Sequence, residues 1–184
     1  KYEQLQSVSR AQLNNLISLY KFQTGTVIDL QAINDVVLYK ITYETVDPAG
    51  EITRASALIG LPEGVDDALP LLAYQHETIV ERSDAPSAKI LDIPTLGLAG
   101  NGYVTVSSDF IGFGDSSGLH PYVHARSIAT AVIDALRATR ELMKLQSVTL
   151  NEQLFLIGYS EGGYATMAVQ RELERNHTTE FSIT

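Results

Sequence analysis

The stretch that decides the fold is GYSEG at residues 158–162, which fits the pattern G-x-S-x-G. A short apolar run, LFLI, stands directly before it, and apolar residues at helical spacing follow over residues 164–175. In this strand–turn–helix context the pattern is typical of a nucleophile elbow, where a strained serine projects its hydroxyl from the edge of a sheet. Gly158 and Gly162 let the backbone on either side of the turn come close. The sequence therefore predicts a serine hydrolase whose nucleophile is Ser160.

A second stretch, GDSSG at residues 114–118, fits the same pattern around Ser116. With glycine at about 7% of residues, such a match arises by chance in roughly one chain of this size in twenty. Here no helix begins at the motif, Pro121 follows soon after it, and the glycine-rich polar composition is typical of a loop. We therefore expect Ser160, not Ser116, to be the nucleophile.

Length and composition restrict the class of protein. A chain of 184 residues with 45% hydrophobic residues has the length of one globular domain. Its 13 basic and 22 acidic side chains give a net charge of −9, so we expect neither nucleic acid nor an anionic membrane as a partner. The chain has no apolar run long enough to span a bilayer, which argues against stable membrane insertion. Because it has no cysteine, disulfides and thiolate metal sites are excluded.

The first residue is Lys1, with no initiator methionine before it. A cleaved export signal and a shortened sequence would each account for this start. We favour export, and therefore expect a secreted or periplasmic protein.

The hydrophobic pattern predicts strands that alternate with helices. The turn sequence DPAG at residues 47–50 predicts a hairpin between the first two strands. The later strands and helices predict a mixed, mostly parallel sheet with helices on both faces, whose ligands collect at the carboxyl ends of the strands. In chain order the predicted elements are a helix over residues 2–20, strands over 36–46, 52–61, 69–74 and 104–107, a helix over 124–145, a strand over 153–157, a helix over 164–175 and the start of a strand at 181–184.

A family resemblance rests on three stretches of sequence and one predicted helix. The stretches are YQH at residues 74–76, SSDFIGFG at 107–114 and GYSEGG at 158–163, and the helix is the one predicted over 124–145. On these the chain resembles the α/β-hydrolases, in particular the secretory lipase (lipase A-like) branch of esterases and lipases. The resemblance covers roughly residue 36 to the last residue. It implies one α/β-hydrolase domain, with a helical N-terminal extension over residues 1–33 and the sheet core, through the elbow, over 34–184.

The resemblance also implies a Ser-His-Asp or Ser-His-Glu triad with the serine first in the chain. After Ser160 the sequence contains no Asp, and its only histidine is His177. His177 lies just past the predicted helix that follows the elbow, where a solvated helix end is the expected role. We therefore expect an N-terminal portion of a longer hydrolase, whose C-terminal remainder supplies the acid and the histidine. The 184 residues alone should be inactive.

Two backbone N–H groups should form the oxyanion hole. The N–H of Glu161, at the start of the elbow helix, is the first candidate. The resemblance implies the N–H of Asp109 as the second, although an Asp in this position could instead cap its own loop. A rival is the loop at His76, where Glu77 replaces the glycine usual in that family. For His76 itself we favour a hydrogen-bonded histidine beneath the active site over a catalytic role.

The remaining candidates for ligand binding have simpler explanations. His120 and His124 flank a Pro-Tyr pair, but no carboxylate or third ligand joins them at a metal-binding spacing, so entry into the following helix is the better interpretation. The GFG at residues 112–114 lacks the third glycine and the helix of a dinucleotide-binding loop. We therefore expect no metal and no cofactor.

These observations favour an esterase or lipase that acts through an acyl-enzyme on Ser160. Its substrate would be a small-molecule ester or a lipid. A serine peptidase of the prolyl-oligopeptidase type shares the elbow, but would carry a propeller domain that the sequence lacks. An incomplete hydrolase that serves as a binding scaffold is the non-enzymatic alternative.

Overall fold

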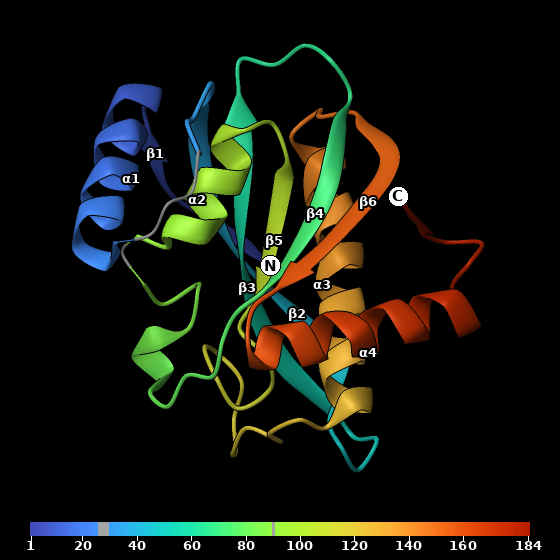
Figure 1. The fold of residues 1–184 in the computed structure, drawn as a ribbon. Helices are drawn as coiled ribbons and strands as arrows, with labels where there is room; N and C mark the ends of the chain where they lie inside the picture. The colour runs from blue at the N-terminus through green and yellow to red at the C-terminus, as the bar shows by residue number, and fades with distance from the viewer. Residues whose placement is uncertain (26–29, 90) are drawn as a thin grey trace.

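A seven-stranded β-sheet with helices on both faces organises the chain (Figure 1). The computed structural model describes residues 1–25, 30–89 and 91–184. In chain order the elements are β1 (Tyr2–Val8), α1 (Arg10–Thr24), β2 (Asp35–Val46), β3 (Ile52–Glu63), β4 (Leu69–Gln75), the short 3₁₀ helix η1 (Arg82–Asp84), α2 (Ile93–Gly100), β5 (Val104–Ser108), α3 (Ala125–Leu145), β6 (Leu150–Gly158), α4 (Glu161–Asn176) and β7 (Ser182–Ile183).

The sheet joins an antiparallel part to a parallel core. Its strand order is β1-β2-β3-β5-β4-β6-β7; pairing is antiparallel from β1 as far as β5 and parallel from β5 to β7. At the β2–β3 turn the Asp47 carboxylate accepts the N–H groups of Ala49 and Glu51, as a DPAG turn favours. Helices α2, α3 and α4 make the crossovers that parallel strands require. The predicted mixed sheet, with an N-terminal antiparallel hairpin and a parallel core, is confirmed.

Alternate residues of β2 point into two separate cores, because successive side chains of a strand face opposite sides of the sheet. Val37 and Tyr39 join the core beneath α3 and α4, whereas Val36 and Leu38 join a smaller core beneath α1 and α2. Helices therefore cover both faces of the sheet, with α1 and α2 on one face and α3 and α4 on the other (Figure 1).

The N-terminal segment differs from the prediction. One helix was expected over residues 2–20, but β1 pairs with β2 as an antiparallel edge strand and the helix begins only at Arg10. Ser9 caps that helix by a reciprocal pair of hydrogen bonds with Gln12, a start signal that lies within the run read as helical. Residues 1–25 of the expected extension therefore form a strand followed by a helix, and the strand widens the sheet.

Helix α2 was not predicted. Its sequence, IPTLGLAG, is short and apolar on every side, so it shows no amphipathic period. The start signals are present: the Asp92 side chain accepts the N–H of Thr95, and Pro94 lies in the first turn. Gly100 is needed for packing, because a Cβ there would overlap Leu13 and Ala32.

Helix α3 matches its prediction within one residue. His124 is its N-cap and accepts the N–H of Ser127, which confirms that this histidine serves helix entry. One face of the helix, including Ile128 and Leu136, is buried against the sheet. In the parts of the chain that the structure describes, no helix combines the length and apolar character needed to cross a bilayer.

The carboxyl ends of β4, β5 and β6 lie side by side at one edge of the sheet. Tyr74 of β4 stands opposite both Ser107 of β5 and Ile157 of β6, so these three strands end at the same level. In Figure 1 the connections that leave them, residues 76–89, 109–124 and the turn into α4, begin at the lower end of the sheet. This edge brings together the segments that the sequence singled out.

Candidate active site

Ser160 stands at a sharp turn between a strand and a helix. β6 ends at Gly158 and α4 begins at Glu161, so Tyr159 and Ser160 alone make the turn. The backbone of Ser160 has φ 55° and ψ −119°, a combination that L-residues rarely adopt and that stores strain. Its side chain is exposed and does not cap the helix. Strand, strained serine and helix together form the geometry expected of a nucleophile elbow.

The two glycines of the turn occupy positions where a side chain does not fit. A Cβ on Gly162 would overlap the carbonyl of Gln75 at the end of β4, and a Cβ on Gly158 would overlap the carbonyl of Gly162. Neither glycine has a positive φ, so close approach and not backbone conformation requires them. Their small size lets the turn press directly against the neighbouring strand.

The N-terminus of α4 leaves a free backbone donor beside Ser160. The N–H of Gly162 donates to Tyr159 at 2.8 Å, and that of Gly163 donates to Ser160 at 2.9 Å. Among residues 1–25, 30–89 and 91–184, the N–H of Glu161 finds no acceptor and the Ser160 hydroxyl has no hydrogen-bond partner. The first N–H groups of a helix carry a partial positive charge, so this donor suits a developing anion next to the serine.

Asp109 does not offer the donor predicted for it. Its backbone N–H already donates to the carbonyl of Ser56 at 3.0 Å, in continuation of the β3–β5 ladder. The prediction that this N–H forms half of the oxyanion hole is therefore wrong. The carboxyl group is fully buried and accepts from the Ser56 hydroxyl and from the backbone and hydroxyl of Ser87. Burial raises the pKa of Asp109, and these hydrogen bonds oppose the rise.

His76 is a buried histidine that joins the ends of two strands. Its Nδ1 lies 2.6 Å from the carbonyl of Glu77 and its Nε2 lies 3.4 Å from the carbonyl of Asp109. The ring also packs on Phe110, with 4.4 Å between ring centroids. Its nitrogens therefore face backbone carbonyls and make no bond to Ser160, which matches the interpretation of His76 as a hydrogen-bonded histidine beneath the active site.

His120 meets Glu161, the residue after Ser160, a pairing that the sequence reasoning missed. His120 Nε2 lies 2.8 Å from Glu161 Oε1, and its Nδ1 lies 2.8 Å from the carbonyl of Ile111. The side chain of His120 is 9% exposed and that of Glu161 is 1% exposed. The sequence carries one signal, a carboxylate immediately after the nucleophile, but a partner 41 residues away becomes visible only in the folded chain.

His177 lies too far from Ser160 to act as its base. It follows the C-terminal end of α4, whose 16 residues span roughly 24 Å. Its Nδ1 accepts from Arg137 at 3.2 Å, and the Arg137 guanidinium also binds Glu180 and lowers the pKa of that carboxyl. In the described ranges of the chain, no group of three His, Asp or Glu side chains is arranged as a metal site would require.

Ser116 is itself buried, but the loop around it is largely exposed and lacks the features of an elbow. The exposure of Ser116 is 2%, and the next helix begins only at Ala125. The guanidinium of Arg82 donates to the carbonyls of Ser116 and Gly118, which holds the loop closed. The expectation that the second G-x-S-x-G stretch is an ordinary loop agrees with this arrangement.

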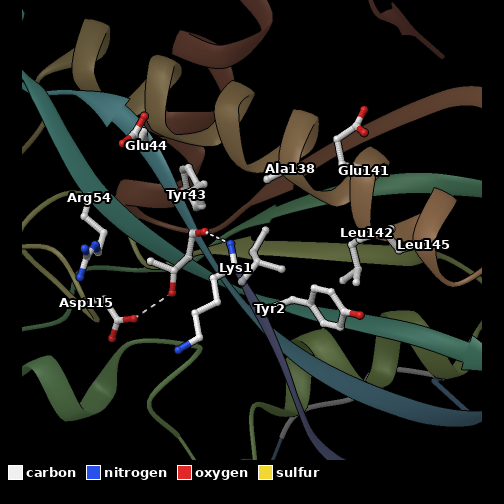
Figure 2. A pocket seen from close by; sticks show the side chains of 12 residues that line it. Lys1, Tyr2, Tyr43, Glu44, Arg54, Asp115, Ala138, Glu141, Leu142 and Leu145 are labelled. Atoms are coloured by element: carbon white, nitrogen blue, oxygen red, sulfur yellow. Dashed lines mark hydrogen bonds between the residues drawn. The ribbon is translucent and has the colours of Figure 1, made fainter.

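A pocket of about 730 Å³ lies elsewhere, between the first strands and α3 (Figure 2). At its centre the terminal amine of Lys1 donates to the carbonyl of Thr42, and the hydroxyl of Thr42 donates to Asp115. Tyr2 also lines the pocket (Figure 2), whereas the hydroxyl of Tyr43, another lining residue, reaches the buried Ser108 hydroxyl. No residue of the turn at Ser160 lines this pocket, so it is separate from the candidate active site.

A family comparison matches the chain to the secretory lipases. The family model described as "Secretory lipase" covers residues 89–182, slightly more than half of the chain, including the loop at His120 and the turn at Ser160. A comparison with curated proteins gave no match.

Solved structures agree with this match. A provisionally assigned hydrolase from Legionella pneumophila is 31% identical, with a TM-score of 0.89 over 100% of this chain and 49% of that one. The rice cell wall degrading esterase LipA from Xanthomonas oryzae is 32% identical, with a TM-score of 0.87 over 100% of this chain and 47% of that one. Lipase A from Candida antarctica in its closed state, at 20% identity, a TM-score of 0.67 and coverage of 100% and 39%, shares the fold. The chain thus spans about half the length of the first two proteins.

Proposed function

The chain belongs to the secretory lipase family, and from this premise we propose that it carries the nucleophile of a serine hydrolase that cleaves carboxylic esters. The observation that carries the proposal is the conformation of Ser160. A strained serine, held between the end of β6 and a helix N-terminus and with no hydroxyl partner among the described residues, serves no evident structural purpose. It is the arrangement that an acyl-transfer nucleophile needs.

In the proposed reaction Ser160 Oγ attacks the ester carbonyl while a histidine takes its proton. The tetrahedral intermediate places its negative oxygen near the N–H of Glu161, and collapse expels the alcohol, which receives the proton from the histidine. Water then attacks the acyl-enzyme by the same route and releases the acid. Each fixed donor in such a site lowers the barrier by roughly 3–4 kcal/mol.

We propose that the base and its acid partner lie in a part of the native protein outside these 184 residues. The four histidines of the chain have other partners: His76 and His120 face backbone carbonyls, His124 caps α3 and His177 binds Arg137. The hydrolases from Legionella pneumophila and Xanthomonas oryzae, which the chain matches over its full length, are about twice as long. The 184 residues alone are accordingly expected to be inactive.

The second oxyanion donor is proposed to come from the loop that follows β4, now that the N–H of Asp109 is assigned to the sheet. This loop runs beside the elbow, because Gln75 at the end of β4 pairs with Gly158. Glu77 does not have the positive φ that would demand a glycine. The replacement of the usual glycine is therefore compatible with an N–H donor from His76 or Glu77.

The substrate class is an ester with an apolar acyl group, or a lipid. Large apolar side chains are exposed in each of the three segments at this edge of the sheet: Val80 is 88% exposed, Leu119 93% and Tyr159 71%. Exposed apolar groups around a nucleophile favour acyl chains over charged substrates.

We also propose that the native protein is secreted or periplasmic, because the family that the chain matches is described as secretory.

A fluorophosphonate probe tests the proposal on the native full-length protein. The label should attach to Ser160, and Ser160→Ala should abolish both labelling and hydrolysis of p-nitrophenyl butyrate, a loss of at least about 10³-fold. Ser116→Ala is the matched control and should keep both. Labelling with cleavage of peptide anilides but not esters would point to a peptidase. Absence of labelling in the folded full-length protein would point to a binding scaffold and contradict the proposal.

A further inference from the structure

Two buried ionisable side chains from distant segments meet at the residue that follows the proposed nucleophile. His120 belongs to the loop between β5 and α3, and Glu161 is the first residue of α4. Their bond, 2.8 Å long between Nε2 and Oε1, links this loop to the residue whose backbone N–H stands next to Ser160. Burying a carboxylate of this kind is costly unless a partner compensates its charge.

The hydrogen-bond partners of His120 fix how many protons the pair holds. Nδ1 faces the carbonyl of Ile111, which can only accept, so Nδ1 carries a hydrogen. Nε2 faces the Glu161 carboxyl group, and a bond between them needs one further proton, on either atom. In both forms the pair has no net charge. The carboxyl group next to the proposed oxyanion site is therefore neutralised.

Packing holds His120 in one orientation. Its ring lies against Phe113 and Phe110, with 4.9 and 5.9 Å between ring centroids. The loop closes on itself at Gly112, which has φ 91° and leaves no room for a Cβ beside the His120 backbone. A ring packed against two phenylalanines and bonded at both nitrogens holds the Glu161 side chain in one position.

We propose that His120 is a positioning residue for the ester hydrolysis, acting through Glu161. This inference rests on the proposed function. The bond holds the first residue of α4 so that its N–H points at the developing oxyanion. It also compensates a carboxylate whose negative charge would otherwise oppose that oxyanion. His120 touches neither Ser160 nor, in this role, the substrate.

Three variants of the full-length protein separate this role from simple structural support. His120→Phe keeps a ring between the two phenylalanines but removes both hydrogen bonds and leaves the Glu161 carboxylate unpaired. We expect kcat for p-nitrophenyl butyrate to fall about 10- to 100-fold, with KM within about twofold, since misplacement near a reacting centre costs up to about 100-fold. Glu161→Gln, at the residue that supplies the proposed oxyanion donor, should lower kcat less than His120→Phe does, because the amide can donate to Nε2 of a neutral His120 that still donates from Nδ1.

The double variant His120→Phe with Glu161→Gln removes the unpaired charge. Its kcat should lie above that of His120→Phe, since only the tether is lost, and below that of Glu161→Gln. If His120→Phe does not fold, the comparison of the double variant with Glu161→Gln alone decides. All rates are expressed per site labelled by the fluorophosphonate probe, so unfolded protein does not count. His124→Asn, which keeps a helix-capping side chain in the same loop, is the control and should match the wild type.

A kcat of the double variant equal to that of Glu161→Gln, or of His120→Phe equal to wild type, would overturn the inference, even if thermal stability falls. Those results leave the proposed function standing, because the wild type would still label at Ser160 and cleave the ester. Failure of the wild type itself to label would instead overturn the proposed function and this inference with it.

Discussion

The stretches at residues 158–162 and 114–118 share the pattern G-x-S-x-G but differ in structure. In the first, Ser160 is exposed, has a positive φ and begins a 16-residue helix. In the second, Ser116 is buried in a loop whose carbonyls accept hydrogen bonds from Arg82. The glycines differ as well: Gly162 is required by close approach to β4, whereas Gly118 has φ 79° and open space around it.

The flanking residues, and not the pattern, separate the two. Strand β6 leads into Ser160, and the helix after it supplies an N–H, that of Glu161, with no acceptor among the described residues. The other stretch follows Asp109, whose carboxyl group binds Ser56, and the Ser56 hydroxyl accepts the N–H of Asp115. Its glycines and serines thus close a loop over a buried polar network. The same five-residue pattern can therefore form a strained strand–helix turn, which we propose presents a nucleophile, or an ordinary loop.

The largest expected difference between the two stretches concerns their terminal glycines. Gly162→Ala should destabilise the full-length protein by about 3 kcal/mol and abolish labelling at Ser160, because the new Cβ would overlap the Gln75 carbonyl. Gly118→Ala is the matched change and should cost about 1 kcal/mol, since only its positive φ opposes a side chain. Urea unfolding and probe labelling measure both effects. Equal losses in the two variants would contradict the distinction.

The buried acid beneath the second stretch predicts a pH effect. Because burial raises the pKa of Asp109, the folded state holds its proton at pH values where the unfolded state has released it. The free energy of unfolding should then fall as the pH rises from the ordinary Asp range through the folded pKa of Asp109, and stay level above it. Asp109→Asn should remove this fall. Urea midpoints of the two proteins over a pH series provide the measurement.

Asp115, inside the second stretch, supplies a control of opposite sign. Burial tends to raise its pKa, but hydrogen bonds and the charge of Lys40 outweigh this and lower it. Its contribution to stability is therefore present above the ordinary Asp pKa and lost as the pH falls through its own lowered value. An Asp115→Asn variant should lose this acid-side dependence and keep the one assigned to Asp109. The same pH response in both variants would contradict the assignment.

Local signals predicted much of the fold, and tertiary contacts account for the rest. The strands of the hairpin, the helix after His124 and the turn at Ser160 carry strong local patterns and were found as expected. β1 was read as helix because Leu5 and Val8 are three residues apart, a spacing that an edge strand also permits. Helix α2 was missed because its sequence is apolar on both sides and so lacks the alternation of apolar and polar residues that indicates a helix.

The features of the candidate site likewise fall into those predicted from a local motif and those that depend on tertiary contacts. Ser160 and the N–H of Glu161 follow from one local motif. The N–H of Asp109 was misassigned because its acceptor, Ser56, lies 53 residues earlier and becomes its neighbour only when β3 pairs with β5. The bond of His120 to Glu161 likewise joins two segments through the sheet. Backbone donors and buried pairs depend on strand order, which residue patterns alone do not fix.

The smallest expected effect comes from a change at Arg82, which tests whether the loop at residues 114–118 influences the reactivity of Ser160. Arg82 donates to the carbonyls of Ser116 and Gly118. Arg82→Ala should therefore cost about 1 kcal/mol, the net value of such bonds at an exposed site. Hydrogen exchange should speed up over residues 114–118, while Arg126→Ala, at the exposed start of α3, should leave it unchanged. The rate at which the fluorophosphonate probe labels Ser160 should stay the same, because no described bond joins Arg82 to the elbow. A slower rate would mean that the loop supports the nucleophile after all.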